Sequence, residues 1–151
     1  MNRIFIGAIA ALSLYSAAYL YADAPPRSGK QLAAVLELVA AKSYTSITEI
    51  SFDDGYWEVE AMKGEASVEL QVDPQSGAVV SERSDGPHPQ LPTNAKTLRD
   101  VVTALEKAGY GQIAKIDFET TGWEAEARRG VQWRELTLDL DGNVVSDHPE
   151  D

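Results

Sequence analysis

The sequence predicts an α+β fold of two tandem repeats, in which each repeat is one helix packed on a four-stranded antiparallel β-meander. The first observation is a hairpin, Ile50–Ala61, whose apolar residues alternate on both sides of Asp54-Gly55, a residue pair typical of two-residue turns. The second is that residues 116–127 keep Ile, Phe, Trp, Glu, Glu and Ala in the same order, at a constant spacing of 66 residues, as from Trp57 to Trp123. The third is an apolar stripe at helical spacing ahead of each hairpin. A fixed spacing of this kind indicates two copies of one structural unit.

The first repeat is predicted over residues 28–84. Ser28 followed by Gln31 has the spacing of a capping box, and the helix is expected to end near Lys42-Ser43. Its apolar stripe consists of Leu32, Val35, Leu36 and Val39. Four strands follow, at residues 48–53, 56–62, 66–72 and 78–81, because apolar and polar residues alternate there between turn residues.

The second repeat is predicted over residues 96–147, after a linker at residues 85–95 that contains three prolines. Thr97 is the expected N-cap of its helix, whose apolar stripe is Leu98, Val101, Val102 and Leu105. The strands match those of the first repeat up to the last turn, which is one residue shorter. Residues 147–151 are expected to form a frayed acidic end.

Residues 1–24 are predicted to be a signal peptide or an N-terminal anchor. Arg3 precedes an uncharged run from Ile4 to Tyr21, and Ala22-Asp23-Ala24 has the small-x-small pattern of a cleavage site. Pro25 after that site disfavours cleavage there, and a run of about 18 apolar residues is just long enough to span a bilayer. Both alternatives export the rest of the chain. The protein is therefore expected to be periplasmic or secreted, with residues 4–21 as its anchor if they are retained.

Composition excludes several functions for this chain of 151 residues, which is 44% hydrophobic. The formal net charge of −11 repels nucleic acid and anionic lipid, so membrane contact is expected only through an uncleaved N-terminal segment. Because there is no cysteine, disulfides, thiolate nucleophiles and cysteine metal sites are absent.

No residue pattern predicts catalysis, a cofactor or a metal centre. His88 and His148 each adjoin a proline and are expected to be solvated, with a joint metal site as the alternative. The Asp139-x-Asp141-Gly142-Asn143 stretch resembles the start of a calcium loop, but Asp141-Gly142 is more simply a hairpin turn. The sequence therefore predicts a protein that is not an enzyme.

Several motifs in both halves resemble the PepSY family. In the first half they are Gly55-Tyr56-Trp57-Glu58-Val59-Glu60 and the stretch Val72-Asp73-Pro74-Gln75-Ser76-Gly77-Ala78-Val79-Val80. In the second half they are Ala108-Gly109-Tyr110, Gly122-Trp123-Glu124-Ala125-Glu126 and Leu140-Asp141-Gly142-Asn143-Val144-Val145. The resemblance implies a module that restrains peptidases or other envelope proteins. A tandem pair is also similar in layout to the β-lactamase inhibitor protein, which presents a concave sheet to an enzyme.

Strand alternation divides the side chains between two faces of the sheet. Trp57 and Trp123 are predicted to point toward the helices as core anchors, whereas Trp133 points outward among charged residues. The predicted partner-binding residues on the outer face are Tyr56, Glu58, Glu60, Met62, Glu124, Glu126, Arg128, Trp133 and Glu135. Trp133 packing against the other repeat, or covering a sheet edge, is the alternative.

The leading functional hypothesis is a non-enzymatic, exported protein-binding module that docks another envelope or secreted protein. Because acidic residues dominate the outer face, that partner is expected to present a basic rim around an apolar pocket. One alternative is a membrane-anchored structural or sensory envelope domain without inhibitory activity. Another is a weak binder of calcium or a small ligand at the acidic turns.

Overall fold

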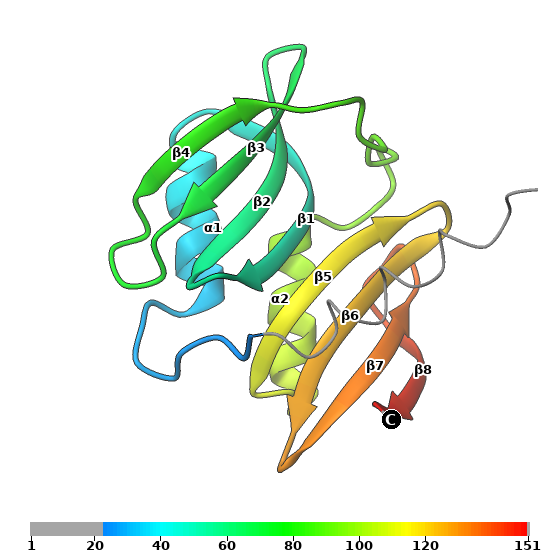
Figure 1. The fold of residues 1–151 in the computed structure, drawn as a ribbon. Helices are drawn as coiled ribbons and strands as arrows, with labels where there is room; N and C mark the ends of the chain where they lie inside the picture. The colour runs from blue at the N-terminus through cyan, green and yellow to red at the C-terminus, as the bar shows by residue number, and fades with distance from the viewer. Residues whose placement is uncertain (1–22, 151) are drawn as a thin grey trace, which may run out of the picture.

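A computed structural model describes residues 23–150 as one eight-stranded antiparallel sheet with two helices on one of its faces (Figure 1). The strand order across the sheet is β4-β3-β2-β1-β5-β6-β7-β8. Along the chain the elements are α1 (Leu32–Ala41), β1 (Tyr44–Asp53), β2 (Tyr56–Lys63), β3 (Ala66–Val72), β4 (Val79–Ser84), α2 (Leu98–Lys107), β5 (Gln112–Glu119), β6 (Gly122–Arg129), β7 (Gln132–Leu138) and β8 (Val144–Pro149).

The prediction of an α+β fold made of two tandem helix-plus-four-strand repeats is wrong. β1 pairs with β5 in antiparallel fashion through Glu49–Ser51 and Lys115–Asp117, and this pairing, here called the seam, makes all eight strands one sheet. The physical reason lies in the strand edges. An unpaired β1 and an unpaired β5 would each expose a row of backbone donors and acceptors, and the seam satisfies part of both rows.

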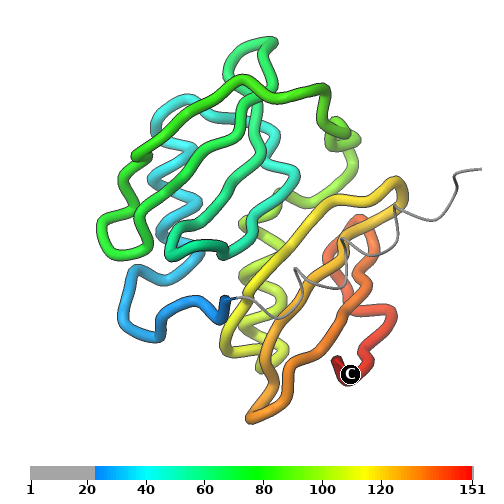
Figure 2. The backbone as a smooth tube through the Cα atoms, viewed as in Figure 1, coloured from blue at the N-terminus to red at the C-terminus, as the bar shows by residue number. Residues whose placement is uncertain are grey.

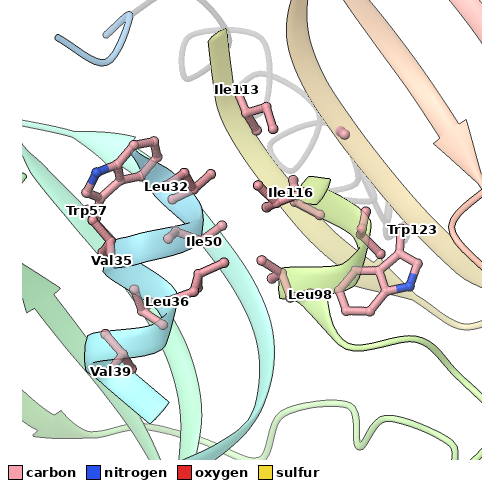
Figure 3. Packing of buried hydrophobic residues seen from close by; sticks show 14 of the residues in the cluster. Leu32, Val35, Leu36, Val39, Ile50, Trp57, Leu98, Ile113, Ile116 and Trp123 are labelled. Atoms are coloured by element: carbon pink, nitrogen blue, oxygen red, sulfur yellow. The ribbon is translucent and has the colours of Figure 1, made fainter. Parts of the chain in front are cut away.

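The core lies between the sheet and the two helices. Both predicted helical stripes are buried there, and Ile50 and Ile116, which are partners across the seam, lie between them (Figure 3). Both residues are fully buried. Apolar residues from both halves therefore form one continuous core that crosses the seam.

The two predicted core tryptophans are confirmed. Trp57 is 4% exposed and Trp123 is fully buried. Each ring packs edge-on against a phenylalanine of the preceding strand, Phe52 or Phe118, with ring centroids 5.1 Å apart and an interplanar angle of 72°. This T-shaped arrangement is the favourable one for aromatic quadrupoles.

The two helices begin in different ways. At α2 the predicted cap is confirmed, because the Thr97 hydroxyl accepts from the backbone N–H of Asp100 at 3.2 Å and the Asp100 carboxylate accepts from that of Thr97, also at 3.2 Å. At α1 the predicted Ser28–Gln31 capping box is wrong: Gln31 is the N-cap, and its side chain makes no capping bond. The chain ahead of α1 is held to the β3–β4 turn instead, since the N–H of Lys30 donates to the carbonyl of Pro74 at 3.0 Å.

Each outermost strand is held by a tyrosine. On β4, Glu82 accepts a hydrogen bond from the Tyr44 hydroxyl and lies 2.9 Å from the Lys63 ammonium. On β8, Asp147 accepts from the Tyr110 hydroxyl at 2.7 Å and from Arg134 Nε at 2.6 Å. The prediction of a frayed end is therefore wrong as far as Pro149, because these bonds and the ladder to β7 hold the strand.

Apart from the short turns, two segments lie outside the helices and strands. One precedes α1, and the other connects β4 to α2. Residues 85–97 run from the end of β4 at one edge of the sheet to the start of α2 (Figure 2). Within residues 23–150, no helix is long and apolar enough to cross a membrane. The predicted signal peptide or anchor at residues 1–24 lies almost wholly outside the described residues.

Candidate functional site

The sheet face opposite the helices is here called the outer face (Figure 1). Each of the eight strands places polar side chains on it. Strand pairing arranges them in two parallel rows that cross the seam without interruption. The first row is Arg83, Glu69, Glu60, Glu49, Asp117, Glu124, Thr137 and Ser146. The second row is Ser81, Gln71, Glu58, Ser51, Lys115, Glu126, Glu135 and His148.

The first row contains five carboxylates on five adjacent strands, from Glu69 on β3 to Glu124 on β6. Like charges directly opposite one another on neighbouring strands are destabilising, whereas opposite charges would stabilise the ladder. Packing of the fold does not require this arrangement, because the buried residues lie on the other face. Each directly opposed pair of ionised carboxylates in the row costs stability, and the ion pair of Arg83 with Glu69 offsets part of this cost.

Lys115 partly compensates this charge at the seam. Its ammonium nitrogen lies 3.5 Å from Glu49 Oε1 and 3.8 Å from Asp117 Oδ1. Burial disfavours its positive charge, but the carboxylates of Glu49, Asp117 and Glu126 outweigh burial and raise the pKa of Lys115 above the ordinary lysine value. One cation is thereby held among several carboxylates in the centre of the outer face.

Several carboxyl groups of the outer face have raised pKa values. Burial, assisted by Glu49 and opposed by Lys115, raises the pKa of Asp117 to about 7. Burial and the nearby Glu150 raise the pKa of Glu126 to about 7. Burial is also the largest cause of the raised pKa of Glu58 and of Glu60. An approaching cation would stabilise the ionised form of all four groups.

The half of the outer face that belongs to β5–β8 is hollowed into an open groove of about 520 Å³. Its lining includes Lys115, Asp117, Glu124, Glu126 and Glu135. Four of these five side chains are carboxylic acids, so the groove suits a cationic group.

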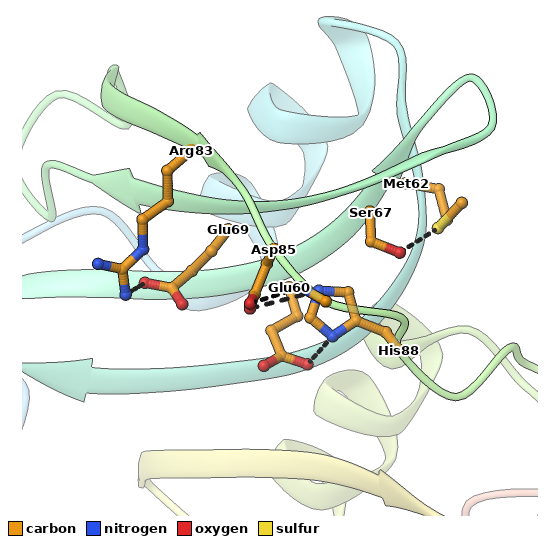
Figure 4. A network of polar contacts seen from close by, with 8 residues as sticks. Glu60, Met62, Ser67, Glu69, Arg83, Asp85 and His88 are labelled. Carbon is orange, nitrogen blue, oxygen red and sulfur yellow. Dashed lines mark hydrogen bonds and ion pairs between the residues drawn. The ribbon is translucent and has the colours of Figure 1, made fainter.

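The connecting segment 85–97 brings a histidine onto the other half of the outer face (Figure 4). His88 Nδ1 lies 2.9 Å from Glu60 Oε2, and the histidine side chain is only 9% exposed. The prediction that His88 is solvated is therefore wrong. It failed because the neighbouring prolines indicate an exposed loop but not the surface against which the loop folds.

The nine predicted partner-binding residues fall in two groups on the outer face. Tyr56, Glu58, Glu60 and Met62 lie on β2, and Glu124, Glu126, Arg128, Trp133 and Glu135 lie on β6 and β7. β1 and β5 separate the groups, so they do not converge on one point. The prediction missed Glu49, Lys115 and Asp117, which fill the space between them. Their alternation with Ile50 and Ile116 was visible in the sequence, but the pairing of their strands was not.

Trp133 is half-buried on β7, directly opposite Arg128 of β6. It does not belong to the hydrophobic core cluster of the described residues. β7 is also not an edge strand, because β8 pairs with it. Trp133 therefore neither fills the core nor covers a free edge.

The other residues considered for metal binding have different surroundings. The Asp139 carboxylate accepts bonds from the backbone N–H groups of Asp141 at 3.0 Å and Asn143 at 2.9 Å, which hold the turn as a cap. His148 lies on β8 opposite Glu135. Because four strands separate β8 from β2, against which His88 packs, the two histidines do not form a joint site.

Of the comparisons with known proteins, the match to a family profile identifies the family of this chain. No curated protein matches the sequence. Among solved structures, the fold is similar to that of a candidate lipoprotein of Clostridium difficile 630, with a TM-score of 0.45 and 11% identity over 87% of this chain and 97% of that chain. The sequence profile of one family, described as "Peptidase propeptide and YPEB domain" (PepSY_2), matches residues 4–83, just over half of the chain. On the strength of that profile match, the chain belongs to the PepSY family of peptidase propeptide and YPEB domains.

Proposed function

We propose that this protein is an exported, non-catalytic module that binds a protein with a basic surface through the outer face of its sheet. The observation that carries the proposal is the first row, with its five carboxylates on adjacent strands. A charged face that weakens the isolated fold is explained if a partner of opposite charge covers it.

The two faces of the sheet differ in what they offer to a partner. α1 and α2 cover one face (Figure 1), and the core lies beneath them, whereas the side chains of the outer face are mostly polar. The groove over β5–β8 can take a lysine or arginine side chain of the partner between its carboxylates. Trp133, beside Arg128, supplies the aromatic surface that interface hot spots commonly use.

The proposal gives the histidines no catalytic role. A hydrolase needs a nucleophile next to a base. In the part of the chain that the structure describes, neither histidine has a hydrogen bond to a serine or threonine hydroxyl. Its family description refers to peptidase propeptides, so an exported peptidase is the partner class we propose first.

The test measures binding of the full chain to purified exported peptidases and to other basic envelope proteins by surface plasmon resonance. Glu60→Lys and Glu124→Lys reverse charges in the first row, and we expect either to reduce the on-rate at low salt at least tenfold. The matched controls are Glu65→Lys, in the β2–β3 turn, and Glu106→Lys, on α2, which change the net charge equally. Equal effects of all four variants would overturn the proposal.

Trp133→Ala tests the aromatic part of the same surface. A desolvated aromatic anchor acts mainly on dissociation, so we expect a faster off-rate and a loss of ~2 kcal/mol or more in binding free energy. An unchanged off-rate, together with loss of binding by the Glu106→Lys variant, would assign the docking surface to the helices instead.

Proton release gives a further readout of where the partner lies. A cationic partner would lower the pKa values of Asp117 and Glu126, both about 7, so binding near neutral pH should release protons. Calorimetry in two buffers of different ionisation enthalpy measures that release, and a binding enthalpy independent of the buffer would contradict it.

A further inference from the structure

His88 is buried although it belongs to a loop. Its neighbours Pro87 and Pro89 are exposed, whereas the His88 side chain is only 9% exposed and lies over β2 (Figure 4). Two prolines restrict the backbone on both sides of the histidine, so its position costs less conformational entropy than that of an ordinary loop residue. The loop therefore presents the imidazole in a preset position.

The two ring nitrogens have different surroundings. Nδ1 lies 2.9 Å from Glu60 Oε2, which is hydrogen-bond distance. Nε2 is buried and has no hydrogen-bond partner, and the nearest carboxylate oxygen, Asp85 Oδ2, is 3.7 Å away. When Nδ1–H donates to Glu60, Nε2 of the neutral ring carries a lone pair that faces another acceptor. A cation between Nε2 and Asp85 Oδ2 would satisfy both atoms.

Asp85 is oriented toward the histidine by its own backbone surroundings. Its Oδ1 accepts from the N–H of Gly86 at 2.7 Å, which leaves Oδ2 directed at the imidazole. Glu60, Asp85 and His88 are also one group of side chains whose ligand atoms all lie within 4.8 Å of one another. The neighbours of Glu60 in the first row, Glu49 and Glu69, add negative charge that favours a bound cation.

We propose that His88 Nε2 and Asp85 Oδ2 bind Zn²⁺, that Glu60 orients the imidazole, and that the metal fastens the connecting segment 85–97 to β2. Histidines that bind zinc usually donate their other N–H to a carboxylate, and Glu60 Oε2, 2.9 Å from His88 Nδ1, is placed to accept such a bond. Neighbouring ligands of a tetrahedral zinc lie about 3.3 Å apart, so the observed 3.7 Å needs only a small adjustment. Because the protein supplies two ligands, water would fill the remaining coordination positions of the zinc ion. Imidazole nitrogen suits zinc, whereas calcium and magnesium prefer oxygen ligands throughout.

Zinc titration of the full chain tests this site, with the histidine side-chain resonances and the melting temperature as readouts. In wild type we expect one equivalent of Zn²⁺ to shift the His88 resonances and raise the melting temperature. His88→Ala should abolish both effects, and Asp85→Asn should weaken zinc binding at least tenfold. Glu60→Gln should weaken it about 10–100-fold, as is usual for a residue that orients a metal ligand. His148→Ala, which removes the other histidine, should behave like wild type.

Three results would overturn the zinc site. The first is wild type without saturable zinc binding. The second is a His88→Ala or Asp85→Asn variant that binds zinc as tightly as wild type. The third is Ca²⁺ producing the same shifts as Zn²⁺. If His88→Ala fails to fold, as judged by circular dichroism, zinc binding by the nearly isosteric Asp85→Asn variant becomes the deciding measurement.

Discussion

Replacing Lys115 by methionine should weaken the seam in a pH-dependent way. The lysine ammonium lies 3.5 Å from Glu49 Oε1 and 3.8 Å from Asp117 Oδ1, and these two carboxylates are direct partners across β1 and β5. Methionine retains most of the aliphatic volume and removes the charge. The variant therefore leaves two opposed carboxylates without their shared cation.

The expected size of the loss follows from these distances. At an effective dielectric constant near 20, each ion pair is worth about 4–5 kcal/mol before the cost of removing the lysine from water. Lys115 remains 36% exposed, so solvent screens both pairs and desolvation offsets much of the rest. We expect a net destabilisation of about 2 kcal/mol when Asp117 is ionised.

The pKa of Asp117 determines how this loss depends on pH. Because its folded-state pKa is raised from the ordinary aspartate value to about 7, the folded protein retains a proton that the unfolded chain releases. Asp117 therefore contributes stability at low pH that is lost as the pH rises toward 7. Its attraction to Lys115 exists only when it is ionised. The Lys115→Met loss should thus be larger at about pH 8.5 than at about pH 5.

Urea denaturation at about pH 8.5 and about pH 5 measures the stability loss of Lys115→Met and its dependence on pH. The exposed Lys42→Met, which removes the same charge after α1, is the control and should change stability by less than about 0.5 kcal/mol. In the double variant Lys115→Met/Asp117→Asn, most of the loss should be recovered at the higher pH. Equal losses for Lys115→Met at both pH values would refute the reasoning.

Three further predictions concern single sites. Trp123→Ala should destabilise by ~3–5 kcal/mol in urea denaturation, since the indole is fully buried; a loss under about 1 kcal/mol would contradict that burial. Gly122→Ala should lower the melting temperature strongly, because the new Cβ would lie 2.1 Å from the Leu138 carbonyl oxygen, whereas Gly86→Ala meets no atom within 4 Å and should not. Glu126→Gln should stabilise by roughly 1 kcal/mol at pH 8 and less at pH 5, because a pKa raised to about 7 makes its ionised form unfavourable in the fold; stabilisation that is equal at both pH values would exclude this cause.

Local features of the sequence predicted the elements and the faces of the strands well. Helical spacing identified the buried stripe of each helix, and alternation placed Trp57 and Trp123 in the core. Thr97 was identifiable as a cap because its hydroxyl accepts a bond from the N–H of Asp100, within one helical turn. Each of these signals is carried by residues only a few positions apart.

The assembly of the sheet required information that such patterns do not contain. The alternation of apolar and polar residues along a strand predicts which face of the sheet each side chain takes. It does not predict which strand lies next to that strand, so the Glu49–Asp117 pair was not predicted. For the same reason the outer-face residues were predicted as two separate groups, without Lys115 between them. His88 was missed because its contact with Glu60 depends on the path of a loop that has no periodicity.

The strand order also sets the route by which the chain can fold. Within β1–β4 and within β5–β8, each strand pairs with its neighbour in the sequence, so every pairing except the seam closes a short loop. The seam joins residues 66 positions apart, as Ile50 and Ile116 are, and its loop closure carries the larger entropic cost. β1 therefore remains an open edge until β5 has been synthesised. During that interval the early hairpins are open to pairing with a second chain, and the speed of seam formation limits this competing association.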